Sequence, residues 1–236
     1  MTLENFAIQV CGWTVGLPLE FLLIAALLSG SYKRFPFVFF YAVANLVTTI
    51  IEIPAYTDWF KRRDEAAAGV HAARIYWYNE WVLQVLVFAV VISLIYQATT
   101  GARLRRVVRS GLIAGAILFA GVSFFVHYGP PPMKYGYWMT PWTRDLNFGA
   151  AVLDLALWGK LIASRERDRR LLLISGALGM QFTGEAIGEA IRDLSIAKTV
   201  QSLSLTGSVV TMLADLACLY VWWRTFRPAR AAYGQK

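Results

Sequence analysis

Carboxylates recur inside the apolar stretches of this chain, where charged side chains are expected to be rare. The group consists of Glu20, Glu52, Glu80, Asp154, Glu185, Glu189 and Asp215. A charge in the centre of a bilayer costs about 2.5–3.5 kcal/mol on insertion scales, so such residues normally face a partner, a cavity or a pathway. Their number predicts a polar, acidic interior that could hold a proton, a metal ion or an organic cation.

The polar residues of the segment around Glu185 fall on one helical face. Gln181, Glu185, Glu189 and Arg192 follow one another at intervals of four, four and three residues, which is the spacing of one side of a helix. Glu185 and Glu189 are one turn apart, and two carboxylates that close rarely ionise together unless a cation lies between them. This pair is therefore the strongest single candidate for a binding site.

The predicted helices place the other candidates at different depths. Glu52, Glu80 and His127 are expected near the outer end with the Glu185 pair, and Asp154 is expected lower, as the floor of the site. Glu20 and Asp215 are expected further inward, where they would continue a proton or ion path. The predicted ligand-binding set is Glu52, Glu80, His127, Asp154, Gln181, Glu185, Glu189 and Arg192.

Two other interpretations of these carboxylates stay open. Burial favours the protonated form of a carboxyl group, so single residues could act as neutral hydrogen-bonding groups between helices. They could also form structural ion pairs with arginines. Either interpretation accounts for one residue more readily than for seven.

The elements that must position these residues are membrane-spanning helices. Hydrophobic residues make up 57% of the 236 residues, against about 45–50% in soluble domains, and a spanning helix needs about 20 mostly apolar residues. Seven stretches qualify, at residues 6–29, 35–56, 76–97, 110–128, 146–163, 171–191 and 200–223. The prediction is an all-α, polytopic seven-helix bundle in one domain, 1–236, with long connections at 57–75 and 129–145.

The distribution of basic residues sets the expected orientation. Of the 23 Lys and Arg residues, 15 fall in the connections and tail on the side of the C-terminus. Cytoplasmic loops carry the excess of positive charge, which predicts N-out/C-in topology, although Lys61–Arg63 on the other side opposes the rule. The net charge of +8 is thus accounted for by topology, and no nucleic-acid partner is expected. The expected location is a bacterial-type inner membrane.

A weak internal repeat links the two halves of the chain. Leu19-Glu20-Phe21 parallels Leu153-Asp154-Leu155, and the same offset carries Glu52 to within one residue of Glu185. Helices one to three and five to seven would then form parallel repeats, as in some transporters, with the fourth helix as connector. Chance similarity between apolar helices is the alternative.

This three-plus-one-plus-three layout is similar to that of SWEET-type sugar transporters and microbial rhodopsins. The resemblance covers helix number and topology only. The stretch 200–223 has no lysine for a retinal Schiff base, and the chain has no Pro-Gln pair. No residue role follows from the resemblance.

Sequence signals for an enzyme are sparse, so catalytic activity is uncertain and disfavoured. The chain has two histidines, His71 and His127, and lacks an HExxH motif, a CxxC motif and a glycine-rich phosphate loop. Cys11 and Cys218 are expected at different depths, too far apart for a disulfide. Any metal, pigment or lipid cofactor stays undetermined.

The leading functional prediction is a small transporter for a small polar or cationic solute, with proton coupling as an option. One alternative is a seven-helix receptor or sensor that acts through a partner protein. Another is an accessory subunit of a larger membrane complex. Besides the lipid bilayer and the solute, a homo-oligomer or a membrane partner is considered.

Overall fold

Seven long helices make up the described part of the chain in the computed structural model, which covers residues 3–62, 66–99, 105–128, 136–163, 168–198 and 201–227. They are α1 (Leu3–Leu28), α2 (Pro36–Lys61), α3 (Ala66–Ala98), α4 (Arg105–His127), α5 (Gly136–Ala163), α6 (Arg169–Lys198) and α7 (Gln201–Phe226). A short 3-10 helix (Ser31–Lys33) follows α1, and these ranges contain no strand. The all-α prediction is confirmed.

Each of the seven helices is long and apolar enough to cross a membrane. Large apolar side chains such as Phe125 and Leu155 are exposed on the outside of the bundle. In water these surfaces would be unfavourable, whereas lipid tails accommodate them. The protein is therefore an integral membrane protein whose helices lie in a lipid bilayer.

Two helices begin ten residues earlier than the sequence predicts. The predicted starts are residues 76 and 146, but α3 begins at Ala66 and α5 at Gly136. Hydropathy detects only the part of a helix in the hydrocarbon core, about 30 Å thick, whereas headgroups extend the membrane to about 40–45 Å. At about 1.5 Å per residue, the 33 residues of α3 reach roughly 50 Å and pass through both layers. The expected long connections at 57–75 and 129–145 are correspondingly shorter.

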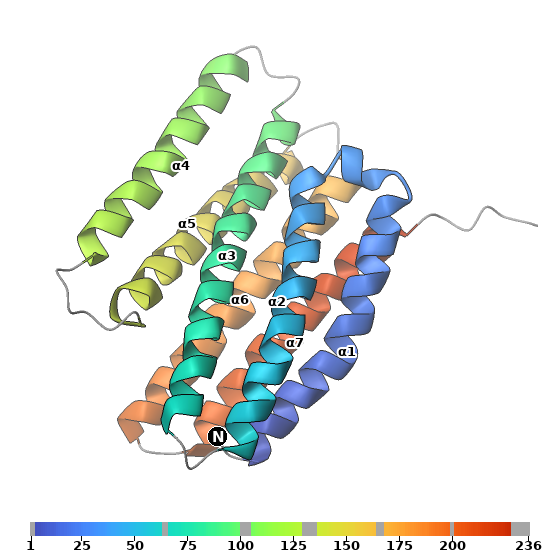
Figure 1. The fold of residues 1–236 in the computed structure, drawn as a ribbon. Helices are drawn as coiled ribbons and strands as arrows, with labels where there is room; N and C mark the ends of the chain where they lie inside the picture. The colour runs from blue at the N-terminus through green and yellow to red at the C-terminus, as the bar shows by residue number, and fades with distance from the viewer. Residues whose placement is uncertain are drawn as a thin grey trace, which may run out of the picture.

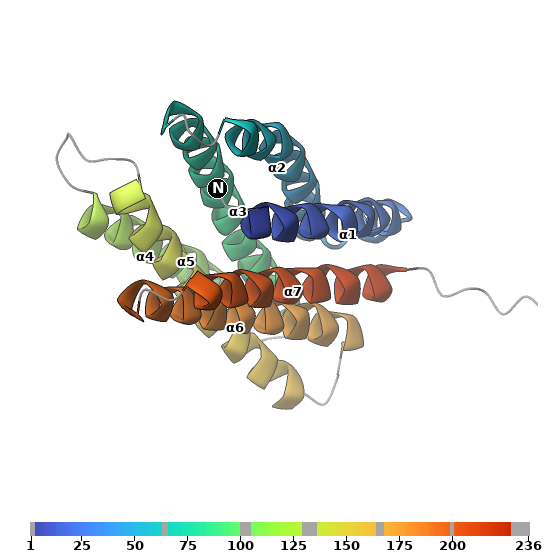
Figure 2. The same ribbon diagram turned by 90° about the horizontal axis from the view of Figure 1, so that it is seen from below.

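Six helices form a ring, and α4 lies outside it. Neighbours around the ring follow the order α1, α2, α3, α5, α6, α7 and back to α1. Helix α4 packs against α5 and touches α3 at a few positions, and Figure 1 shows it at the edge of the molecule. In Figure 2, where the bundle is seen from below, α1–α3 lie on one side and α6 and α7 on the other.

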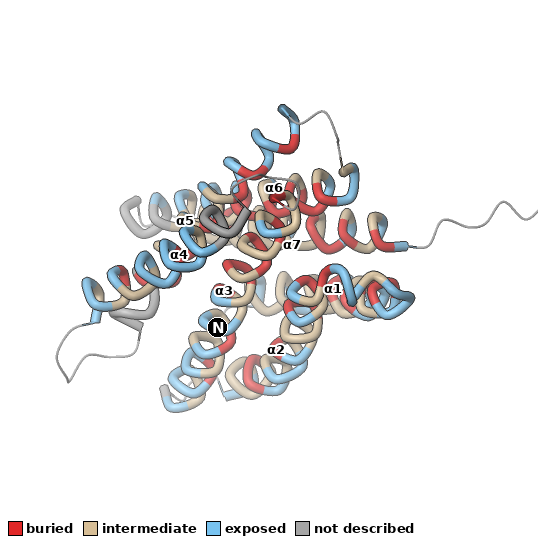
Figure 3. The backbone as a smooth tube through the Cα atoms, turned by 90° about the horizontal axis from the view of Figure 1, so that it is seen from above, coloured by how far each residue is buried: buried red, intermediate tan, exposed pale blue. Residues whose placement is uncertain are grey.

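Side chains of both α4 and α5 attach α4 to the ring. Ser123 Oγ donates a hydrogen bond of 2.6 Å to Asp145 Oδ2, and His127 Nε2 lies 3.0 Å from the same oxygen. The indole of Trp142 donates to the carbonyl oxygen of Ala120 at 3.1 Å. Most of the outer surface of α4 remains exposed, as Figure 3 shows.

Glycines allow α6 and α7 to approach closely. A Cβ atom on Gly184 would lie 2.1 Å from the Cβ of Ala214, and one on Gly188 would lie 2.7 Å from the carbonyl oxygen of Gly207. Small residues of this kind permit close packing of membrane helices. By contrast, a Cβ on Gly111 in α4 would meet nothing within 4 Å.

The half of the bundle that contains the C-terminal end of α7 has an apolar core. Leu23, Leu27, Leu94, Ile174 and Trp222 are fully buried there. The indole of Trp222 donates a hydrogen bond of 3.1 Å to the carbonyl oxygen of Ile174. This core closes the ring at what we call the C-terminal end, opposite the N-terminal end where α1 begins.

Candidate functional site

The ring encloses a cavity of about 470 Å³ in its N-terminal half. Its lining runs from Ile8 to Glu20 along α1 and from Ser208 to Leu219 along α7. The other ring helices contribute to it, but no described side chain of α4 does. Six carboxylates line the cavity, namely Glu20, Glu52, Glu80, Glu185, Glu189 and Asp215. Six of the seven carboxylates singled out from sequence therefore share one space.

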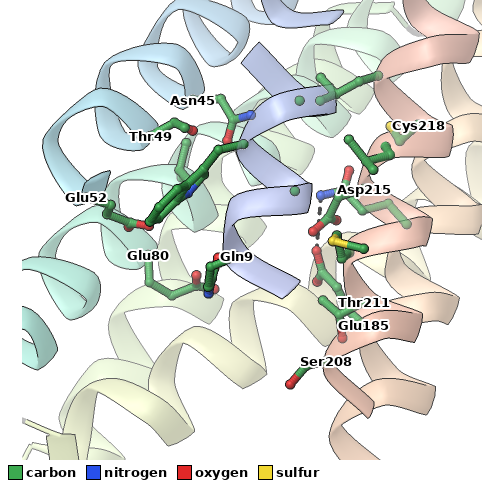
Figure 4. A pocket seen from close by; sticks show the side chains of 18 of the residues that line it. Gln9, Asn45, Thr49, Glu52, Glu80, Glu185, Ser208, Thr211, Asp215 and Cys218 are labelled. Carbon is green, nitrogen blue, oxygen red and sulfur yellow. Dashed lines mark hydrogen bonds between the residues drawn. The ribbon is translucent and has the colours of Figure 1, made fainter. Parts of the chain in front are cut away.

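The carboxylates occupy opposite walls of the cavity. Figure 4 shows Glu52 and Glu80 on the side of α2 and α3, with Gln9 of α1 near Glu80. Glu185 and Asp215 lie close together on the side of α6 and α7. A solute between the walls would thus meet carboxylates from both sides.

Helix α2 supplies hydrogen bonds to the carboxylate of α1. Asn45 Nδ2 donates to Glu20 Oε1 at 2.7 Å, and Thr49 Oγ1 approaches the same oxygen at 3.5 Å. The other oxygen of Glu20 is buried and has no hydrogen-bond partner among the described residues. The Glu20 side chain is therefore positioned from one side and left free on the other.

Neighbouring amides hold the carboxylates of α2 and α3. Asn79 Nδ2 donates to Glu52 Oε1 at 2.9 Å, and Gln84 Nε2 donates to Glu80 Oε1 at 3.0 Å. Asn79 is buried and also reaches the carbonyl oxygen of Thr48 at 3.4 Å. One α3 side chain thus fixes the position of Glu52.

Glu185 accepts hydrogen bonds from two amides. Asn147 Nδ2 donates to Oε2 of Glu185, and Gln181 Nε2 donates to Oε1 at 3.1 Å. The Gln181 amide also lies 3.3 Å from the hydroxyl of Tyr41. Helices α2, α5 and α6 therefore meet at Glu185.

Among the described residues of the lining, Arg192 of α6 is the one basic side chain. Among the described residues, none of the six carboxylates forms an ion pair with a Lys or Arg side chain; the ion pairs found involve Asp58, Asp145 and Asp168. If all were ionised, six carboxylates and one guanidinium would give a formal charge of −5. The predicted alternative of one structural arginine for each carboxylate therefore does not describe this site.

Aromatic side chains form part of the lining. Trp13, Tyr41, Tyr56 and Tyr76 all face the cavity. The rings of Trp13 and Tyr56 meet edge to face, with centroids 6.1 Å apart. Such faces attract cations, so the walls combine negative charge with π surfaces.

Two residues predicted for the site lie elsewhere. Asp154 of α5 is buried and accepts a hydrogen bond of 2.7 Å from Ser175, but it is not part of the lining. His127 contacts Asp145 at the outside of the ring. The expected depths of Asp154 and His127 in the membrane placed them near the other candidates. Depth does not determine the direction in which a side chain points from its helix.

The structure also adds residues that the sequence analysis did not select. Asn79 fixes Glu52, while Tyr41 and Trp13 line the cavity. Asn79 directly precedes Glu80 inside an apolar stretch, which was a usable signal. The aromatic residues gave none, because apolar stretches in membrane proteins contain many rings that only pack.

Below the cavity, an ion pair joins two connections at the C-terminal end. Arg34 donates to Asp168, and Gln97 Nε2 donates to the carbonyl oxygen of Arg34 at 2.9 Å. Burial favours a raised pKa for Asp168, but hydrogen bonds from the N–H groups of Leu171 and Arg170 and from Arg34 outweigh it and lower the pKa. This cluster ties the α1–α2 connection to the start of α6 and to the end of α3.

The described residues contain no group of three or more His, Cys, Asp or Glu side chains arranged to hold a metal ion. Four carboxylates of the cavity accept hydrogen bonds from amides: Glu20, Glu52, Glu80 and Glu185.

Comparison of the chain with protein-family profiles, with curated proteins and with solved structures finds no match. Function is therefore inferred from the geometry of the cavity.

Proposed function

We propose that the protein is a small membrane transporter that accepts a small polar or cationic solute in the acidic cavity. The observation that carries this proposal is the convergence of six carboxylates from five helices on one cavity, where the described lining has one guanidinium. Such a constellation is costly in a membrane, and ionisable residues inside membranes normally mark a binding site or a pathway. The volume also lies in the range of small-molecule sites, about 300–1,000 Å³.

The order of helices in the ring supports a transporter with two related halves. A half-turn about the membrane normal would carry α1 to α5, α2 to α6 and α3 to α7 while preserving the neighbours of each helix. In both halves, the second helix donates a hydrogen bond to a carboxylate of the first, from Asn45 to Glu20 and from Ser175 to Asp154. Transporters built from parallel repeats bind solute at the repeat interface.

The closed C-terminal end fits one state of an alternating-access cycle. The apolar core and the Arg34–Asp168 pair seal that end, while the lining extends toward the N-terminal end. Described basic residues at the sealed end include Lys33, Arg34, Lys160, Arg169, Arg170, Arg224 and Arg227. The positive-inside rule then makes this end cytoplasmic, and we propose an outward-facing cavity in a bacterial inner membrane. Proton coupling through Glu20 and Asp215 belongs to the same proposal.

Transport is tested in proteoliposomes on a solid-supported membrane. Concentration jumps of methylammonium, guanidinium, choline and benzylammonium should give transport currents with wild-type protein for at least one probe. Glu185→Gln should abolish the current, because it removes a carboxylate held at the meeting point of three helices. Asp154→Asn is the matched control, since that carboxylate is buried but lies outside the cavity. Equal loss in both variants would contradict the assignment of the site.

A receptor or sensor is the second candidate, and the apolar seal favours it. From Glu20 to the end of α1 at Leu28, eight residues span about 12 Å without a cavity-lining side chain. A sensor would bind solute in this closed pocket and pass a helix shift to a partner at the basic end. Binding without any current would select this function over transport.

A further inference from the structure

Among the described residues of the lining, the fully buried side-chain atoms that lack a hydrogen-bond partner are all oxygens. Four buried side-chain oxygens of the lining have no hydrogen-bond partner in the described part of the chain: Glu20 Oε2, Gln84 Oε1, Asn147 Oδ1 and Asp215 Oδ1. A buried acceptor without a donor costs roughly 1–3 kcal/mol. Four of them around one cavity point to an occupant that supplies donors.

The reason for this imbalance lies in the amides. Asn45, Gln84, Asn147 and Gln181 each donate through nitrogen to a carboxylate of the cavity. Their N–H groups are therefore directed at the wall, and the carbonyl oxygens of Gln84 and Asn147 are left over. The arrangement holds carboxylates in position and leaves these oxygens without a donor.

Two of the free oxygens are deeply buried. Glu20 is only 3% exposed and Gln84 only 9% exposed, and both residues line the cavity. They belong to α1 and α3, the two helices that flank α2 in the ring. A solute that satisfies both must carry several donors around one centre.

The aromatic lining restricts the solute further. Trp13, Tyr41 and Tyr56 provide ring surface next to the carboxylates, which favours a cation with an apolar body. A quaternary ammonium offers positive charge but no N–H donor. A bare metal ion would leave the ring surfaces unused, and an anion would be repelled by the carboxylates.

We infer that the cavity binds a small organic cation with several N–H donors, a primary ammonium or a guanidinium-type group carried on an apolar body. Its head lies among Glu20, Asp215 and Gln84, and its body lies against Trp13 and Tyr56. This inference rests on the proposed function, in that it names the chemical class of the solute.

The test is calorimetric binding to the full-length protein in lipid nanodiscs with four probes. Benzylammonium and benzamidinium carry donors, benzyltrimethylammonium has the same body and charge without donors, and phenylacetate reverses the charge. We expect the two donor-bearing probes to bind at least about tenfold more tightly than benzyltrimethylammonium, because hydrogen bonds to charged groups are lost, and phenylacetate not to bind.

Variants then locate the site. Glu20→Gln and Asp215→Asn should each weaken benzylammonium binding about tenfold or more, while Asp154→Asn should bind like wild type. Thermal unfolding and size-exclusion profiles check that the variants fold, and the probe series on wild-type protein tests the inference without any variant.

Equal or tighter binding of benzyltrimethylammonium, binding of phenylacetate, or no binding of either donor-bearing probe would overturn the inference. Binding of benzylammonium without transport current would refute the transporter and leave the solute class intact. A current carried by a cation without N–H donors, together with no benzylammonium binding, would refute the solute class and leave the transporter intact.

Discussion

The contact between α6 and α7 gives a prediction whose magnitude follows from distances. A Cβ added at Gly188 would lie 2.2 Å from Thr211 Oγ1 and 2.7 Å from the carbonyl oxygen of Gly207. The hydroxyl already donates to that carbonyl at 3.2 Å, so it has little freedom to turn away. The clash of the added Cβ can be relieved only if the backbones of α6 and α7 separate. Such overpacking typically costs about 1–3 kcal/mol, and contact with backbone puts Gly188→Ala near the upper value.

Helix propensity partly offsets this cost. Alanine gains roughly 0.8–1.0 kcal/mol over glycine in a helix interior, which leaves a net destabilisation of about 2 kcal/mol. At about 2–4 °C per kcal/mol for a chain of this size, the Tm of Gly188→Ala should fall by roughly 4–8 °C. The separation of the backbones should also displace Thr211 from the cavity wall.

Gly111→Ala on α4 is the matched control. Its Cβ would meet nothing within 4 Å, so only the propensity gain applies and Tm should stay constant or rise slightly. The assay is thermal unfolding in nanodiscs, followed by tryptophan fluorescence. If Gly188→Ala is as stable as Gly111→Ala, the close α6–α7 contact is wrong.

Three further predictions concern the ties around the cavity. Asn79→Ala should lower stability by about 1–3 kcal/mol, because Glu52 loses its buried donor; an unchanged Tm would contradict this. Asp168→Asn should cost at most about 1 kcal/mol, because the pair with Arg34 is partly exposed. Since the pKa of Asp168 is lowered in the folded state, this difference in Tm should persist at neutral pH and vanish as pH falls through that pKa; a difference that grows in acid would refute it. His127→Gln should loosen α4, seen as faster hydrogen exchange, without changing benzylammonium binding.

Much of the fold could be predicted because hydrocarbon imposes strict rules. Each spanning segment must be helical and apolar, so the number of helices followed directly from hydropathy. The starts of α3 and α5 could not be predicted in the same way. The turns before Tyr76 consist mainly of small residues with His71 and Arg74 among them, which lowers their hydropathy without preventing a helix. The predicted repeat makes the fourth helix a connector between the halves, and its spanning stretch has few polar residues, such as Ser123 and His127. Both features agree with the place of α4 outside the ring.

Most of the ionisable residues of the candidate site could be predicted from the sequence, but their arrangement around the cavity could be predicted only in part. The stripe of Gln181, Glu185, Glu189 and Arg192 lines the cavity, because the spacing of residues along a helix fixes a common face. Asp154 does not, since the rotation of α5 is set by packing against α6, where Ser175 meets its carboxylate. Rotation of a helix about its axis depends on contacts with other helices, which spacing within one segment does not contain.

Water access to the acidic cavity tests the central claim most directly. In a background of Cys11→Ser and Cys218→Ala, single cysteines replace Thr49 and Ser208 of the lining, and Val152, which is half exposed on the outside of α5. A cationic and an anionic methanethiosulfonate are applied to oriented membranes. Because thiolates react in water and the cavity is acidic, we predict reaction at positions 49 and 208, faster with the cationic reagent, and little at position 152. Unreactive cysteines at both lining positions, or faster reaction with the anionic reagent, would contradict a shared aqueous cavity of carboxylates.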